Sequence, residues 1–147
     1  MANLKYSIRE LVENDLAYVS ELCAQLGYPT NTKDVMPRLR DILSRENHKV
    51  FVAETTDGKV VGWCHVHIYP LLECDLIGEI GGLVVDKDYR GNGIGSELII
   101  QSELWAKCSG CNTINLRSNV IRKEAHIFYK CIGYENVKEQ YTFRKQI

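Results

Sequence analysis

The sequence predicts an α/β fold, with a mixed, mostly antiparallel central sheet and helices on both faces. Two observations predict this class. Apolar residues recur at strand and helix periods along the chain, in the order βααβββαβαβ(β). Residues 76–117 are predicted to run strand, helix, strand, and such a crossover makes its two strands parallel neighbours. The 147 residues fit one domain, 1–147, which can bury a core without disulfides or metal.

The first third of the chain is predicted to hold one strand and two helices. Residues 4–9 alternate as a strand does. Residues 16–26 carry apolar side chains at helical spacing and precede Gly27, a usual helix stop. The second helix contains Pro37, which fits only in a first turn or kinks the helix, so Asp34 is the expected N-cap.

The middle of the chain is predicted to form three strands. Residues 49–54 and 59–69 flank Asp57-Gly58, a strong signal for a hairpin turn. Residues 76–85 form the third strand, which leads into a glycine-rich turn. The three strands account for the antiparallel part of the sheet.

The last third of the chain alternates helix and strand. A helix follows the glycine-rich turn and ends before Gly110, and residues 112–117 form a strand. Apolar residues at i, i+3, i+4 and i+7 predict a helix around 125–132, which Gly133 ends. Residues 134–144 are expected to return as one or two strands.

Composition and charge exclude several classes of function. The formal net charge is −1, whereas nucleic-acid-binding proteins usually show a basic excess, so nucleic acid is not an expected partner. No apolar run approaches the roughly 18 residues of a membrane helix, and the first residues lack the apolar core of a signal peptide. We therefore expect a cytoplasmic protein with no membrane partner. In that compartment the six cysteines are expected to be small buried hydrophobes.

The glycine-rich turn carries the main chemical signal. Its glycines let backbone N–H groups approach a ligand, and the following helix adds unpaired N–H groups and the positive end of its dipole. Together these suit a pyrophosphate. A P-loop is excluded because the turn contains no lysine, and a dinucleotide fold because its third glycine is misplaced and no acid lies about 20 residues further on. The turn consists of Arg90, Gly91, Asn92, Gly93, Ile94, Gly95 and Ser96.

Arg90-x-x-Gly93-x-Gly95 resembles the R/Q-x-x-G-x-G/A signature of the GNAT superfamily of acyl-CoA N-acyltransferases. The segment from Asn119 to Tyr134 is similar to the family's N…A…FY…GF block. The resemblance covers nearly the whole chain. It implies an N-acetyltransferase that uses acetyl-CoA as co-substrate and a small-molecule primary amine as acceptor, by direct attack in a ternary complex. Aminoalkylphosphonate and aminoglycoside acetylating branches are both compatible with it. A protein N-terminus or lysine as acceptor, and a non-catalytic acyl-CoA sensor, are the alternatives.

The resemblance also implies how acetyl-CoA is held. Backbone groups of residues 83–85 would pair with the pantetheine arm as an added strand does. An N–H near Val84 would bond the thioester oxygen, N–H groups of the turn would hold the pyrophosphate, and Asn119 would contact the arm. The residues implied to bind acetyl-CoA are Leu83, Val84, Val85, Arg90, Gly91, Asn92, Gly93, Ile94, Gly95, Ser96, Asn119 and Tyr129.

Two residues are the candidates for proton transfer. Tyr129 matches the family's usual acid, which protonates the leaving CoA thiolate. Glu79 is the candidate base, because it lies on the strand that leads to the cofactor site, among apolar and glycine neighbours. Many relatives carry an acid just before the Leu-Val-Val stretch, where this chain has Gly82, and this departure favours Glu79 or a water relay.

The acceptor site is expected to be lined by polar residues of the middle strands. His65 and His67 alternate onto one face of their strand, but no clear third ligand accompanies them, so no metal is expected. Short strands at the C-terminus would leave a sheet edge, which is compatible with a homodimer. The expected acceptor-site residues are His65, His67, Tyr69, Glu73 and Glu79.

Overall fold

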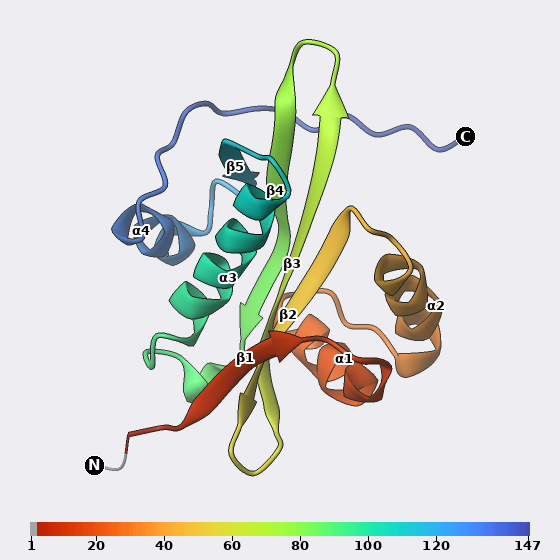
Figure 1. The fold of residues 1–147 in the computed structure, drawn as a ribbon, viewed down its shortest axis with the longest axis vertical. Helices are drawn as coiled ribbons and strands as arrows, with labels where there is room; N and C mark the ends of the chain where they lie inside the picture. The colour runs from red at the N-terminus through yellow and green to blue at the C-terminus, as the bar shows by residue number, and fades with distance from the viewer. Residues whose placement is uncertain (1–2) are drawn as a thin grey trace. The chain divides into compact units, whose positions relative to one another are not determined.

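Five strands form one sheet, in the spatial order β1-β2-β3-β4-β5 (Figure 1). The first four strands pair antiparallel and β5 pairs parallel with β4, as the predicted crossover requires. The computed structural model describes residues 3–147. The strands are β1 Tyr6–Glu10, β2 His48–Thr55, β3 Val60–Leu71, β4 Cys74–Val85 and β5 Thr113–Leu116. The helices are α1 Leu16–Gln25, α2 Thr32–Leu43, α3 Ile94–Cys108 and α4 Lys123–Cys131, with short 3-10 turns at Glu13–Asp15 and Lys87–Tyr89.

The chain divides into two units, one that ends at Arg117 and one over residues 118–147. The first unit holds the whole sheet with α1, α2 and α3, and the second holds α4. In the first unit, α1 and α2 cover one face of the sheet and α3 covers the other (Figure 1). The predicted α/β class with helices on both faces of a mixed sheet is confirmed.

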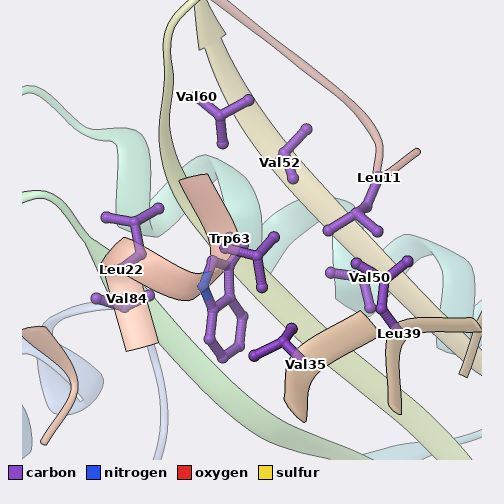
Figure 2. Close-up of a cluster of buried hydrophobic side chains, with 10 residues drawn as sticks. Leu11, Leu22, Val35, Leu39, Val50, Val52, Val60, Trp63 and Val84 are labelled. Carbon is purple, nitrogen blue, oxygen red and sulfur yellow. The ribbon is translucent and has the colours of Figure 1, made fainter. Parts of the chain in front are cut away.

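The core under α1 and α2 is built around the Trp63 ring (Figure 2). Trp63 points from β3 toward Leu22 of α1 and Val35 of α2, and all three side chains are at most 9% exposed. Burial of such side chains is the main source of folding free energy, at roughly 25 cal/mol per Å² of apolar surface. The buried members of this cluster are Leu11, Val19, Leu22, Val35, Leu39, Val50, Val52, Val60, Trp63 and Val84.

The other face of the sheet packs against α3. Leu98 and Ser102 of α3 and Cys64 of β3 are fully buried there, and Ser102 donates a hydrogen bond to the Leu98 carbonyl at 2.9 Å. Burial raises the pKa of the Cys64 thiol to about 12, which leaves it unreactive. Cys111 is also buried, but Cys74, Cys108 and Cys131 are exposed, so the expectation of six buried cysteines is wrong for these three.

Two local predictions also differ from the structure. The α2 helix begins earlier than expected, because Asn31 is its N-cap and accepts a hydrogen bond from the Asp34 backbone at 2.9 Å. Pro37 lies inside this helix rather than in its first turn. The expected strands over 134–144 are absent, and the described residues after α4 form no helix or strand. A strand exists only through its ladder of hydrogen bonds, and no ladder in residues 3–147 includes this segment.

Candidate active site

The β4 strand has two halves with different neighbours. Residues 77–80 pair with β3 on one side and with residues 113–116 of β5 on the other. Beyond Ile80 and Leu116 the parallel ladder stops, while β4 continues to Val85 with β3 as its one strand partner in the described chain. The backbone of residues 83–85 therefore has one side open to an extended ligand, which is where the sequence places the pantetheine arm.

A β-bulge marks the point where β4 changes from one half to the other. Gly82 lies opposite His65 and Ile80 lies opposite Val66, so Gly81 is an extra residue on β4. Bulges bend a strand and re-aim its side chains, and they are frequent beside active sites. Here the bulge coincides with the end of the β4–β5 ladder.

Gly82 is required by the packing of the core. A Cβ at this position would lie 2.9 Å from Cζ3 of Trp63 and 3.0 Å from its Cη2, closer than carbon atoms approach. The indole ring therefore occupies the space that a side chain at position 82 would need. This contact accounts for the glycine at position 82.

The glycine-rich turn and the start of α3 form an exposed cradle of backbone groups. Gly91 and Gly93 have φ of 79° and 81°, values that residues with a Cβ adopt only with strain. Gly93 is the N-cap of α3, and no side chain caps the helix, so its first N–H groups remain available to an anion. Arg90 donates a hydrogen bond from Nε to the Val85 carbonyl at 3.0 Å, which ties the turn to the end of β4.

Glu79 lies at the centre of a row of polar side chains that crosses the sheet. This polar row consists of His48, His65, His67, Tyr69, Glu79 and Arg117. Its carboxylate is 3.3 Å from His67 Nε2 on β3 and 3.3 Å from Nε of Arg117, which follows β5. The Glu79 side chain is 12% exposed. Burial, followed by the charge and hydrogen bonding of Glu79, raises the pKa of Tyr69. Glu79 is therefore surrounded by polar partners rather than by the apolar and glycine neighbours expected from the sequence.

Three histidines stack beside Glu79. The rings of His48 and His65 have centroids 5.2 Å apart, those of His48 and His67 5.1 Å, and His48 Nδ1 lies 2.9 Å from His65 Nε2. Burial, followed by the charges of His48 and His67, lowers the pKa of His65 to about 4. The His65 ring is therefore neutral at pH 7.

The other predicted acceptor-site residues divide between this row and the hairpin tip. The Tyr69 ring stacks on His67 at 5.5 Å and so belongs to the row. Glu73 is exposed in the turn between β3 and β4, six residues from Glu79, which is about 20 Å along an extended strand. The structure does not bring Glu73 together with the other four.

Asn119 and Tyr129 lie in the second unit, where their local contacts are clear. Asn119 accepts a hydrogen bond from the Ile121 backbone at 3.1 Å, and its carbonyl lies 2.9 Å from His126 Nε2. The Tyr129 ring, half-buried on α4, packs edge-on against Tyr134 at 6.0 Å. These contacts shape the turn before α4 and the end of the helix.

Sequence reasoning missed three residues of the candidate site. His48 and Arg117 join the polar row through strand register, which the spacing along the chain does not reveal. Tyr6 of β1 donates a hydrogen bond to the Asn92 carbonyl at 3.4 Å and so supports the glycine-rich turn from 86 positions away. A signal for these residues would have required the pairing of the strands.

The chain matches the family described as "Acetyltransferase (GNAT) family" over residues 15–134. It belongs to this acetyltransferase family. An aminoglycoside N(6')-acetyltransferase type 1 of Stenotrophomonas maltophilia is 28% identical over 142 residues, which cover 94% of this chain and 92% of the relative. An aminoalkylphosphonate N-acetyltransferase of Salmonella typhimurium is 32% identical over 136 residues, which cover 92% and 79%.

Solved structures of GNAT acetyltransferases share the fold. Glucosamine-6-phosphate N-acetyltransferase from Arabidopsis thaliana has a TM-score of 0.83 at 27% identity, covering 97% of this chain and 99% of that one. Aminoglycoside N-acetyltransferase AAC(6')-Iy in complex with CoA has a TM-score of 0.88 at 19% identity, covering 99% and 98%. The predicted class is thus confirmed: the GNAT chain is an acetyltransferase that uses acetyl-CoA as co-substrate. No helix among residues 3–147 is long and apolar enough to cross a membrane.

Proposed function

We propose that this GNAT enzyme acetylates a primary amine of a small molecule by direct attack within a ternary complex, as a single catalytic domain over 1–147. The observation that carries the proposal is the position of Glu79, two residues before the bulge at which β4 loses its β5 neighbour. A carboxylate there is next to the open stretch of β4 proposed to hold the thioester. Two relatives that match over most of this chain are named for the acetylation of aminoglycosides and of aminoalkylphosphonates, and they support a small amine as acceptor.

The proposed donor site uses backbone groups almost throughout. The open side of residues 83–85 pairs with the pantetheine arm, and an N–H near Val84 stabilises the charge that develops on the thioester oxygen. The N–H groups of residues 90–96 hold the pyrophosphate at the uncapped start of α3. Asn119 of the second unit is proposed to contact the arm, on the strength of the family motif alone.

The proposed reaction balances with three proton transfers. The acceptor ammonium loses a proton to Glu79, directly or through a water, and the free amine attacks the thioester carbonyl. The C–N bond forms, the C–S bond breaks, and Tyr129 donates its phenolic proton to the departing CoA thiolate. The new amide nitrogen then gives up its second proton, which returns through water to the Tyr129 phenolate, and Glu79 releases the first proton to solvent. The support for Tyr129 is its match to the family motif, and the support for Glu79 is its place on β4.

The acceptor is proposed to bind over the polar row of β3 and β4. His65, His67 and Tyr69 share a face with Glu79, and an ammonium group placed there would meet the carboxylate, the neutral His65 ring and the Tyr69 ring. Charge and aromatic faces both favour a cation. The row is therefore suited to an acceptor that arrives with its amine protonated.

Release of free CoA thiol from acetyl-CoA tests the proposal. The full chain is assayed with an aminoalkylphosphonate, an aminoglycoside and a peptide with a free N-terminus, each at matched concentration. Amine-dependent release with one of the small molecules, and a mass gain of one acetyl group on that molecule, would support the proposal. Release with the peptide alone would replace it by protein acetylation.

The proposal includes a homodimer. Both edge strands are short, five residues in β1 and four in β5, and proteins seldom leave a sheet edge bare. The apolar residues Val137, Tyr141 and Phe143 after α4 are 79% to 92% exposed, which favours a covered surface. Light scattering at working concentration measures the mass directly, and a monomer mass would refute the dimer.

A further inference from the structure

Three imidazoles from two strands converge on one face of the sheet. In the antiparallel register of β2 and β3, His48 lies opposite His67 and Val50 lies opposite His65, so His48 joins the pair that alternates on β3. One ligating atom from each histidine lies within 4.8 Å of the others. This register supplies the third ligand that the spacing of His65 and His67 alone did not indicate.

Two of these nitrogens are already close to the separation that a metal imposes. His48 Nδ1 and His65 Nε2 lie 2.9 Å apart. Two imidazole nitrogens on one tetrahedral Zn²⁺ lie about 3.3 Å apart, because each Zn–N bond is about 2.0–2.1 Å. If these two nitrogens moved apart by a few tenths of an ångström, a metal ion could bind between them in place of the hydrogen-bonded proton.

The third ring has a nitrogen without a partner. His67 Nδ1 is buried and has no hydrogen-bond partner in the described part of the chain, while its Nε2 pairs with Glu79 at 3.3 Å. A metal-ligating histidine usually has its second nitrogen bound to a carboxylate or carbonyl, which fixes the ring. Glu79 is the carboxylate that pairs with the second nitrogen of His67. Orphaned buried nitrogens are uncommon in folded proteins and require an explanation.

The bulge places backbone rather than a side chain beside the rings. A Cβ at position 81 would lie 3.2 Å from Nδ1 of His65 and 3.6 Å from Nδ1 of His67, so both rings face bare backbone at Gly81. The three rings are partly buried.

We propose that His48, His65 and His67 bind one divalent transition-metal ion of the class that prefers imidazole, with Zn²⁺ as the reference ion. Three nitrogen ligands leave a fourth position for water or for a substrate group, as in open zinc sites. Glu79 would orient His67 through its second nitrogen. Because metal binding needs only the three rings, it can be measured without any acceptor.

Zinc affinity measured on the full chain tests the site. The chelator-treated protein is titrated with Zn²⁺ against a chromophoric competitor, as wild type, as the double variant H48Q/H65Q and as the control H126Q. His126 is the one remaining histidine of the sequence and lies in the second unit. The double variant is expected to weaken binding at least about 100-fold, the upper end of the loss seen when a mere supporting residue is removed. H126Q is expected to keep wild-type affinity.

The cysteines need their own control. Cys108 and Cys111 could capture zinc as a thiolate pair, so C108S/C111S is titrated in parallel and is expected to bind as wild type does. Loss of binding in C108S/C111S together with full binding in H48Q/H65Q would overturn the proposal.

A residue-specific measurement covers the case in which H48Q/H65Q fails to fold. Ring ¹⁵N signals of all four histidines are followed in wild-type protein at up to one equivalent of Zn²⁺. Large shifts at His48, His65 and His67 with none at His126 are expected. Unchanged ring signals of the cluster at one equivalent would overturn the proposal.

Discussion

The two halves of β4 differ in what they offer to a substrate. Residues 77–80 are paired on both sides, so their backbone is occupied and their contribution is a side chain, Glu79. Residues 82–85 are paired with β3 on one side, so the other side of their backbone is available. One strand thus divides the proposed reaction between a carboxylate for the amine and main-chain groups for the thioester.

The difference between the halves predicts how variants should behave. A substitution that changes only the Glu79 side chain should spare CoA binding and impair the reaction of the amine. A substitution that adds a side chain at a glycine of the turn should impair CoA binding instead. The first three predictions below test the donor and acceptor sides, from the largest expected effect on the reaction to the smallest, and the fourth concerns folding stability.

Removal of the Tyr129 hydroxyl should give the largest effect. In Y129F the ring remains, but the proposed acid for the CoA thiolate is lost, so kcat should fall roughly 10²–10⁴-fold. Affinity for CoA should be nearly kept, which calorimetry can measure beside steady-state rates. Equal kcat values for the variant and the wild type, with chemistry shown to be rate-limiting by single-turnover data, would remove Tyr129 from the mechanism.

Glu79→Gln should slow the reaction on the acceptor side of the strand. The proposed base is lost, and kcat/KM should fall roughly 10²-fold at the pH where the wild-type rate is highest. The rising limb of the pH profile should disappear in E79Q. The control R117Q removes the partner cation and keeps the carboxylate, so its kcat/KM should stay much closer to that of the wild type.

The amine's own ionisation can imitate this limb, so acceptors of different basicity are compared. A limb that tracks the acceptor and persists in E79Q at a near-normal rate would make Glu79 structural. Water or the free-base fraction of the amine would then serve as the base.

Gly93→Val should weaken CoA binding at least about tenfold, or about 1.4 kcal/mol, because a side chain would cover the N–H groups at the start of α3. Valine is also strained at a φ of 81°. G110V is the matched control, since Gly110 has a φ of 101° at the other end of the same helix. G93V and G110V are expected to lose similar thermal stability, whereas G93V alone is expected to lose affinity for CoA. Unchanged affinity in G93V would place the pyrophosphate elsewhere.

The neutral His65 ring should make folding stability depend on pH. Its pKa is lowered to about 4 in the folded chain, mainly by burial, whereas an unfolded histidine titrates near 6.5. Between these values the unfolded chain binds more protons, so stability is full above about 6.5 and falls as pH drops toward about 4. The loss by pH 4 should be on the order of 3 kcal/mol. Chemical denaturation at several pH values measures it, and a slope in H65Q equal to that of the wild type would contradict the assignment.

The form of the glycine-rich turn could be predicted from the sequence because its signal is local. The glycines of residues 91–95 and the helix that follows them are contiguous in the chain, and contiguous residues need no tertiary information. Positive φ at Gly91 and Gly93 agrees with the reason given for those glycines. The strands of the sheet and the crossover were predictable in the same way, from periodicity and turn residues.

The polar row around Glu79 could not be predicted in full because it is assembled across strands. The partners of Glu79 come from β3 and from the residue after β5, and His48 enters through the β2–β3 register. The prediction of strands over residues 134–144 was wrong for a related reason. Their alternation satisfies the local condition for a strand, but pairing also needs a neighbour, which a pattern cannot supply.

The contact between Gly82 and Trp63 makes these two positions inseparable in any search for new activities. A library that varies position 82 alone will return glycine, because every other residue collides with the indole ring. Replacing Trp63 alone would leave a void in the middle of the cluster under α1 and α2. An acid at position 82 is therefore reachable only by changing both residues in one step, with a smaller side chain at 63 giving back the space that the new carboxylate takes.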